Sequence, residues 1–87
     1  MQSYALVTGA STGIGREIAR CFAKAQIPLI LVSRQLEVLE KVRHDLMEFS
    51  NQPIEVISMD LSLPQAASEL CQRTVDLGLE VEYLVNN

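Results

Sequence analysis

Short apolar runs alternate with segments of helical periodicity along this chain, and the alternation restricts its fold more than any other feature. The runs are residues 4–7, 27–32, 54–57 and 81–85. Runs rich in Val, Ile and Leu without strict polar alternation are typical of strands buried on both faces of a parallel sheet. Strands that alternate with helices indicate parallel crossover units, which are almost always right-handed. We therefore expect an α/β fold in the order β-α-β-α-β-α-β.

The three segments between these runs each place apolar residues on one helical face. The third helix is expected to begin with Ser62 as N-cap, Pro64 in the first turn and Gln65 completing a capping box. It is expected to end at Gly78 in the left-handed conformation. The three apolar faces are Ile14, Ile18, Cys21, Phe22 and Ala25; Leu39, Val42, Leu46 and Phe49; and Ala67, Leu70, Thr74 and Leu77.

Composition excludes several classes of protein. Seven basic against eleven acidic residues give a net charge of −4, whereas nucleic acids and anionic membranes need a basic surface. No apolar run approaches the length of about 20 residues that spans a bilayer, and no signal peptide is visible. Two cysteines are too few for a disulfide framework or a zinc site. We expect a cytoplasmic chain that binds no metal, no nucleic acid and no membrane.

Three glycines lie between the first strand and the first helix, in the sequence TGASTGIG at residues 8–15. Gly9 permits a tight turn, Gly13 lets the backbone approach a pyrophosphate, and Gly15 lets the helix pack closely on the sheet. The free N–H groups and the dipole at the start of the helix favour a phosphate there. The alternative is an ordinary glycine turn that binds no ligand.

This spacing resembles the cofactor loop of the short-chain dehydrogenases/reductases. Ser33-Arg34, Asp60-Leu61 and Asn86-Asn87 follow the second, third and fourth strands, as comparable pairs do in that family. The resemblance implies a truncated Rossmann-type three-layer fold: residues 1–87 as one incomplete domain, with four parallel strands in the order 3-2-1-4 and three helices. It implies a cofactor site made of Gly9, Ser11, Thr12, Gly13, Ile14, Gly15, Ser33, Arg34, Asp60, Leu61, Asn86 and Asn87.

Arg34 bears on the choice of cofactor. In dinucleotide folds an acidic residue near this place binds the ribose 2′-hydroxyl of NAD, but here the first carboxylate is Glu37. An arginine can instead make charge-assisted hydrogen bonds to the 2′-phosphate of NADP. NADP is therefore expected, with NAD as the less favoured cofactor. The alternative is that Arg34 only begins a solvated helix.

The remaining pairs have two interpretations each. By resemblance, Asp60 meets the adenine amino group with Leu61 against the ring, while Thr8 and Asn86 support the nicotinamide side. Alternatively, Asp60 is a turn residue, and Thr8 and Asn86 are polar residues at strand ends that need no ligand.

The family's catalytic residues are a serine and a tyrosine followed four positions later by lysine. Here Tyr4 is followed by Thr8, and Tyr83 by Asn87, so no catalytic residue is expected in this chain. We expect the N-terminal part of an NADP-dependent oxidoreductase acting on a carbonyl or an alcohol, inactive by itself. The alternatives are a non-catalytic nucleotide-binding module and an inert truncated fragment.

Other residues are expected to be structural. His44 should be solvated, and Cys21 and Cys71 should lie on opposite faces of the sheet. The link after the first helix is Gln26-Ile27-Pro28, so this helix must end without the usual glycine cap. The fourth strand is expected to form an unprotected apolar edge through which the isolated chain self-associates.

Overall fold

Four parallel strands form one sheet in the order β3-β2-β1-β4 in the computed structural model, which describes residues 3–86. The expected strand order is therefore confirmed. The elements are β1 (Ser3–Thr8), α1 (Gly13–Lys24), β2 (Leu29–Ser33), α2 (Leu36–Leu46), β3 (Ile54–Ser58), α3 (Ala66–Asp76) and β4 (Glu80–Val85).

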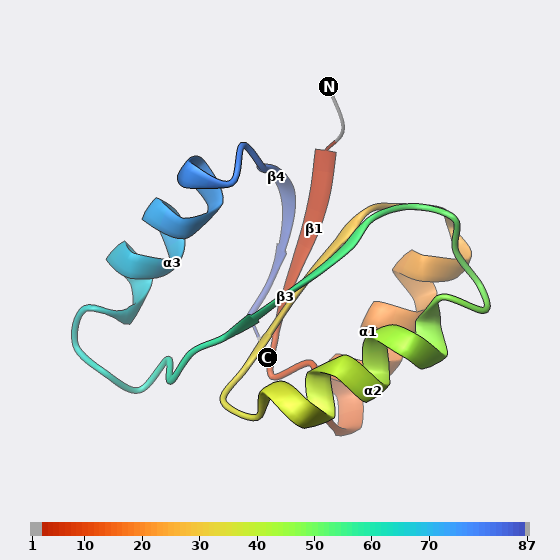
Figure 1. Cartoon of the computed structure of the whole chain (residues 1–87), viewed down its shortest axis with the longest axis horizontal. Helices are drawn as coiled ribbons and strands as arrows, with labels where there is room; N and C mark the ends of the chain where they lie inside the picture. Colours follow the sequence, from red (N-terminus) through yellow and green to blue (C-terminus); the bar gives the residue numbers. More distant parts are fainter. Residues whose placement is uncertain (1–2, 87) are drawn as a thin grey trace.

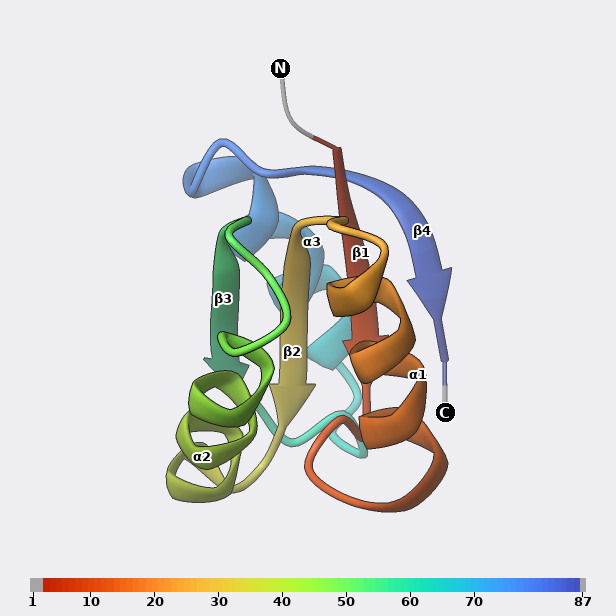
Figure 2. The ribbon, with the colours of Figure 1, turned by 90° about the vertical axis from the view of Figure 1, so that its right-hand side faces the viewer.

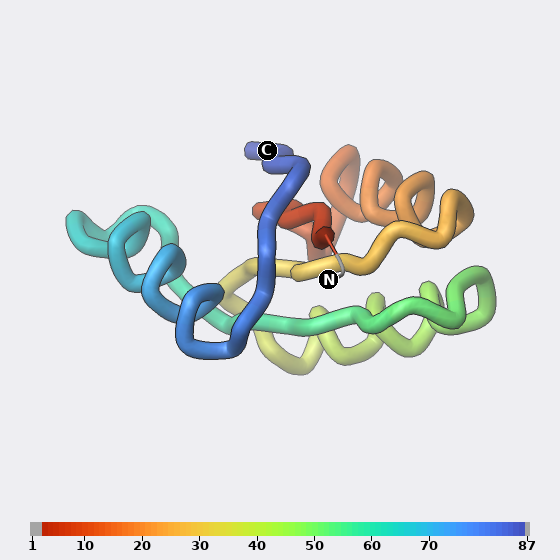
Figure 3. Tube along the Cα trace, turned by 90° about the horizontal axis from the view of Figure 1, so that it is seen from above, coloured from red at the N-terminus to blue at the C-terminus, as the bar shows by residue number. Residues whose placement is uncertain are grey.

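The helices cover the two faces of the sheet unequally. Helices α1 and α2 lie on one face and α3 on the other, as Figures 1 and 3 show. Cys21 on α1 and Cys71 on α3 are thus on opposite faces, as expected, and both are exposed. All four strands run in the same direction, so their carboxyl ends share one edge (Figure 2).

The two central strands, β1 and β2, carry the core. Leu29 and Leu31 point toward α1 and α2, whereas Ile30 and Val32 point toward α3, and all four are fully buried. Two apolar clusters therefore meet back to back across the sheet. This burial on both faces explains why the second run lacks polar alternation.

Helix α1 buries only part of the face that the sequence predicts, since Ile18 and Phe22 are half-buried and Phe22 packs against the core. Ile14 is 71% exposed and Cys21 is also exposed. The residues that face the sheet are Gly15, Ala19 and Ala23, one helical turn apart. Small side chains let the helix backbone lie close to the strands, which a prediction weighted toward large apolar residues misses. Helix α2, by contrast, buries Leu39, Val42 and Leu46 as predicted.

Helix α3 begins later than expected. It starts at Ala66 with Gln65 as its N-cap and no side-chain capping bond, so the predicted capping box does not form. The reason is that Ser62 is engaged by Asp60, whose Oδ1 accepts hydrogen bonds from the Ser62 N–H (2.9 Å) and Oγ (2.6 Å). Ala66 and Thr74 are buried and Leu70 between them is half-buried, whereas the predicted Ala67 and Leu77 are exposed.

Two helices end in the same way with different residues. After α3, Gly78 adopts the left-handed conformation (φ 70°) as predicted, and Leu79 N–H donates to the Thr74 carbonyl at 2.9 Å. After α1 the left-handed residue is Gln26 (φ 60°), and Ile27 N–H donates to the Phe22 carbonyl at 3.0 Å. Both are Schellman motifs.

The side chain of Gln26 offsets the strain of its backbone. Its Nε2 donates to the carbonyl of Phe49 (2.6 Å), and its Oε1 accepts from the N–H of Asn51 (3.1 Å). Gln26 thereby joins the end of α1 to the loop after α2.

Strand β4 pairs with β1 on one side and ends the sheet on the other. Leu84 is 68% exposed, and Val81 and Tyr83 are also exposed.

None of the helices within residues 3–86 is long and apolar enough to cross a membrane. His44 lies exposed on α2, as predicted.

Replacing Gln26 tests whether its two hydrogen bonds offset its backbone strain. Gln26→Ala keeps a side chain in the left-handed region and loses both bonds, so we expect the free energy of unfolding to fall by about 1–2 kcal/mol. Gln26→Gly loses the same bonds but relieves the strain, so it should be the more stable of the two variants. Urea denaturation measures both, and an alanine variant at least as stable as the glycine variant would contradict this account.

Replacing Leu84 tests the expected self-association through β4. Sedimentation velocity over a concentration series should show the wild-type chain associating, because an exposed apolar edge strand offers unpaired backbone groups to a second copy. Leu84→Lys should reduce the association. Val75→Lys, at a side chain 65% exposed on α3, is the matched control and should not. A wild type that stays monomeric throughout the series would show the expectation to be wrong.

Candidate functional site

A cleft of about 590 Å³ opens at the edge of the sheet where all four strands end. This is where parallel α/β sheets bind ligands, at the point where the strand order reverses between β1 and β4. Its walls come from segments far apart in the sequence. The lining residues are Thr8, Gly9, Ser11, Thr12, Ser33, Arg34, Gln35, Met59, Asp60, Leu61, Ser62 and Asn86.

The loop between β1 and α1 presents the start of a helix beside this cleft. Thr12 is the N-cap, in an extended conformation, and its side chain makes no capping hydrogen bond. The first turn of α1 contains no acidic residue. The N–H groups and the positive end of the helix dipole are therefore left for another partner, and no carboxylate at the helix start opposes an anion.

Gly13 shapes this helix start. Its φ of 61° lies in the left-handed region, and a Cβ built on it would meet no atom within 4 Å. The glycine is thus required by backbone conformation and not by protein packing. The space in front of it is open, as an approach by a bulky anion requires.

The structure brings most of the predicted site residues together. Of the twelve, eight line the cleft: Gly9, Ser11, Thr12, Ser33, Arg34, Asp60, Leu61 and Asn86. Gly13 and Ile14 instead border a separate groove between α1 and α2, and Gly15 is buried. Asn87 lies outside the described residues.

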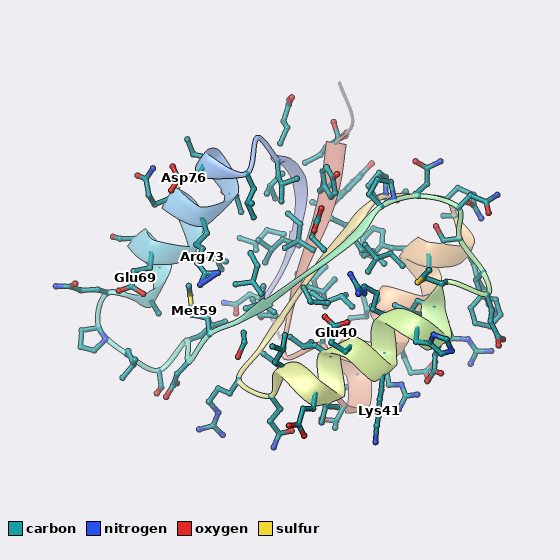
Figure 4. The ribbon with its side chains drawn as sticks, in the orientation of Figure 1. Glu40, Lys41, Met59, Glu69, Arg73 and Asp76 are labelled. Atoms are coloured by element: carbon teal, nitrogen blue, oxygen red, sulfur yellow. The ribbon has the colours of Figure 1, made fainter. Side chains whose placement is uncertain are left out.

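Three residues of the cleft were missed by the sequence analysis: Gln35, Met59 and Ser62. Gln35 and Met59 adjoin predicted site residues at strand ends, so their position next to Arg34 and Asp60 was the available signal. Met59 also packs against the apolar cluster on the α3 side (Figure 4). Ser62 is assigned by its pattern to a helix cap, which hides its contact with Asp60.

Asp60 is held as a carboxylate at the mouth of the cleft. The hydrogen bonds from the Ser62 hydroxyl and N–H lower the pKa of Asp60 below the usual aspartate value, and the positive charge of Arg34 lowers it further. Because the pKa is depressed in the folded chain, this interaction stabilises the fold above the ordinary aspartate pKa and is lost as the pH falls through the depressed value. Both hydrogen bonds from Ser62 are accepted by Oδ1 of Asp60, so Ser62 does not occupy Oδ2.

Thr8 connects the ends of β1 and β4. Its Oγ1 lies 3.3 Å from the carbonyl oxygen of Val85 and 3.3 Å from Oδ1 of Asn86. Thr8 and Asn86 therefore tie the two strand ends together without a ligand.

Neither tyrosine lines the cleft. Tyr4 lies in the core, where burial, and secondly the charge of Glu55, raise its pKa, the opposite of what a tyrosine base requires. Tyr83 packs against Phe22, with ring centroids 5.6 Å apart. No group of three or more His, Cys, Asp or Glu side chains within residues 3–86 could hold a metal ion.

The groove between α1 and α2 is larger, about 660 Å³, but differs in chemistry. Its walls are apolar side chains such as Ile18, Val42 and Leu46, and the ion pair between Arg16 and Asp45 (3.0 Å) lies on it. It contains no strand end. The smaller cleft therefore has the hydroxyl, amide and strand-end groups that recognise a nucleotide, whereas the larger groove combines an apolar floor with the charged side chains of Arg16, Glu17, Arg20 and Asp45.

Comparison with known proteins agrees with this geometry. The sequence profile described as short chain dehydrogenase matches residues 3–87. A very-long-chain 3-oxoacyl-CoA reductase-like protein of Arabidopsis thaliana is 43% identical over 86 residues, which are 98% of this chain and 27% of that protein.

Solved structures show the same fold. L-sorbose reductase from Gluconobacter frateurii, complexed with NADPH and L-sorbose, has a TM-score of 0.88 at 29% identity, over 99% of this chain and 33% of that one. An alcohol dehydrogenase from the archaeon Thermococcus sibiricus, complexed with 5-hydroxy-NADP, has a TM-score of 0.85 at 30% identity, over 97% and 36%.

The chain spans about a quarter of the length of the curated relatives it matches first. The match nevertheless includes every strand and helix described above. The strand order, the glycine loop and the matching profile together show that this chain belongs to the short-chain dehydrogenase family.

Proposed function

We propose that this chain is the cofactor-binding part of an NADP-dependent oxidoreductase that acts on a carbonyl or an alcohol. The observation that carries the proposal is the helix start beside the cleft, which no side chain caps and whose first residue is Gly13, left-handed and open to solvent where a Cβ would project. NADPH supplies the hydride in such a reaction. The residues of this chain would bind and orient the dinucleotide.

The pyrophosphate is assigned to the loop at residues 9–15. The N–H groups of Gly13, Ile14 and Gly15 at the start of α1 would donate to its oxygens, and the helix dipole would add to the attraction. The polar side chains of Ser11 and Thr12 line the cleft beside it. The Ile14 side chain is not needed in the cleft for this role.

The adenosine end is assigned to the ends of β2 and β3. Arg34 and Ser33 would bind the 2′-phosphate of NADP, and Oδ2 of Asp60 would accept a hydrogen bond from the adenine amino group beside Leu61. Glu37 does not line this cleft but a separate hollow, so it does not take the place of the carboxylate that favours NAD. NADPH or an NADP derivative is bound in the two solved structures described above.

The nicotinamide side is assigned to the ends of β1 and β4. The hydroxyl of Thr8 holds Asn86 there at 3.3 Å. Asn86 and Asn87 are proposed to support this half of the site. The substrate and the catalytic groups are not assigned to residues of this chain.

Replacing Arg34 tests the cofactor preference. In Arg34→Gln the charge-assisted bond to the 2′-phosphate is lost, so the Kd for NADP+ should rise about 10- to 100-fold while the Kd for NAD+ stays unchanged. Isothermal titration calorimetry measures both constants. Arg73→Gln, on α3 away from the cleft, is the control and should change neither. Equal weakening of both cofactors by Arg34→Gln would contradict the assignment of Arg34.

Replacing Gly13 tests the pyrophosphate assignment, and Gly78 provides a matched control. Both glycines have a positive φ and open space where a Cβ would project. An alanine at either position should therefore cost a similar free energy of unfolding, about 1–2 kcal/mol. Gly13→Ala should also weaken NADP+ and NAD+ together, because both carry the pyrophosphate, whereas Gly78→Ala should weaken neither. If the two variants bind both cofactors like the wild type, the glycine loop is not the phosphate site.

A further inference from the structure

Ser58 makes a contact with the main chain of Arg34 that the proposed function does not use. Ser58 is the last residue of β3, and its Oγ donates a 3.0 Å hydrogen bond to the carbonyl oxygen of Arg34. The strand register places Ser58 opposite Ser33, the residue before Arg34. Within residues 3–86, no other side chain hydrogen-bonds to the main chain of Arg34.

The segment that carries Arg34 has few other constraints. Met59 N–H donates to the Ser33 carbonyl at 2.8 Å, and Gln35 N–H donates to the Ser33 hydroxyl at 3.3 Å. These bonds hold the peptide units before and after the Arg34 Cα, since the Ser33 carbonyl shares a peptide with the Arg34 N–H and the Gln35 N–H shares one with the Arg34 carbonyl. Helix α2 then begins at Leu36 without a side-chain cap. The Arg34–Gln35 peptide is therefore held at its N–H by the Ser33 hydroxyl and at its carbonyl by the Ser58 hydroxyl, and Ser58 is the side chain that holds it from the neighbouring strand β3.

The surroundings explain why this contact matters for the direction of the Arg34 side chain. Arg34 lines both the cleft and a neighbouring hollow of about 430 Å³ that Ser58 and Glu37 also line. Glu37 would attract the guanidinium into the hollow and away from the cleft. A main chain held by β3 keeps the arginine at the border, within reach of a ligand in the cleft.

We infer that Ser58 is a positioning residue that holds Arg34 in place for the 2′-phosphate of NADP, an inference that rests on the proposed function. Ser58 itself touches no cofactor in this account. Its hydroxyl acts through the Arg34 carbonyl, so its loss should affect the phosphate-bearing cofactor and leave the other unchanged. A merely structural role would weaken both alike.

The decisive comparison is between Ser58→Thr and Ser58→Val, which have the same shape and differ in the hydroxyl. The quantity measured is the ratio of the Kd for NAD+ to the Kd for NADP+ from isothermal titration calorimetry, with the thermal unfolding midpoint recorded for each variant. Ser58→Val should lower this ratio about two- to tenfold, the range that one neutral hydrogen bond supports, and Ser58→Thr should preserve it. Ser58→Ala should behave like Ser58→Val. Ser68→Ala, on the exposed surface of α3, is the control and should behave like the wild type.

The outcomes separate this inference from the proposed function. A wild type that binds NADP+ no better than NAD+ contradicts the proposed preference itself. A wild type that prefers NADP+, with Ser58→Val and Ser58→Thr giving the same ratio, overturns the role of Ser58 alone. An equal weakening of both cofactors in Ser58→Val also overturns it, because it shows a structural role.

Discussion

The common direction of the four strands is the constraint from which the rest of this molecule follows. Parallel strands cannot be joined by tight hairpins, so every connection crosses a face of the sheet as a helix. The polar segments after the strands then collect at one edge. Thr8 and Asn86 lie 78 positions apart and meet there at 3.3 Å. The cleft is thus a product of topology, and no single loop contains it.

Left-handed backbone positions mark the places where this topology needs abrupt turns. Gly13 and Gly78 meet the need with glycine and open space around it. Gln26 meets it with a side chain that binds the loop after α2 in return. A glycine would have left the end of α1 and the loop after α2 without that connection. The same backbone conformation therefore faces open space at Gly13 and supports tertiary structure at Gln26.

The sequence predicts the elements and their order better than it predicts which helical faces are buried. Helix α2 is predicted well because Leu39, Val42 and Leu46 are large and regularly spaced. Helix α1 is not, because close packing favours Gly15, Ala19 and Ala23, whose small side chains carry little weight in a hydrophobic pattern.

The cleft, too, was predicted where it depends on the apolar runs and missed where it depends on contacts between side chains. Eight of twelve predicted residues line it, since strand ends can be located from the apolar runs. Ser62 could not be assigned correctly, because its pattern fits a helix cap and a contact with Asp60 equally well. The hydrogen bond from Ser58 to the Arg34 carbonyl joins two strands whose register no local pattern reveals.

The central claim is that a dinucleotide lies along the carboxyl edge of the sheet and not in the larger apolar groove between α1 and α2. The most direct measurement is a titration of the ¹⁵N-labelled chain with NADP+, followed through the chemical shifts of its backbone amides. The account predicts that the largest shifts fall on residues 9–15, with further shifts at residues 33–35 and 60–62. Shifts concentrated around Ile18, Val42 and Phe49, with the amides of residues 9–15 unmoved, would contradict it.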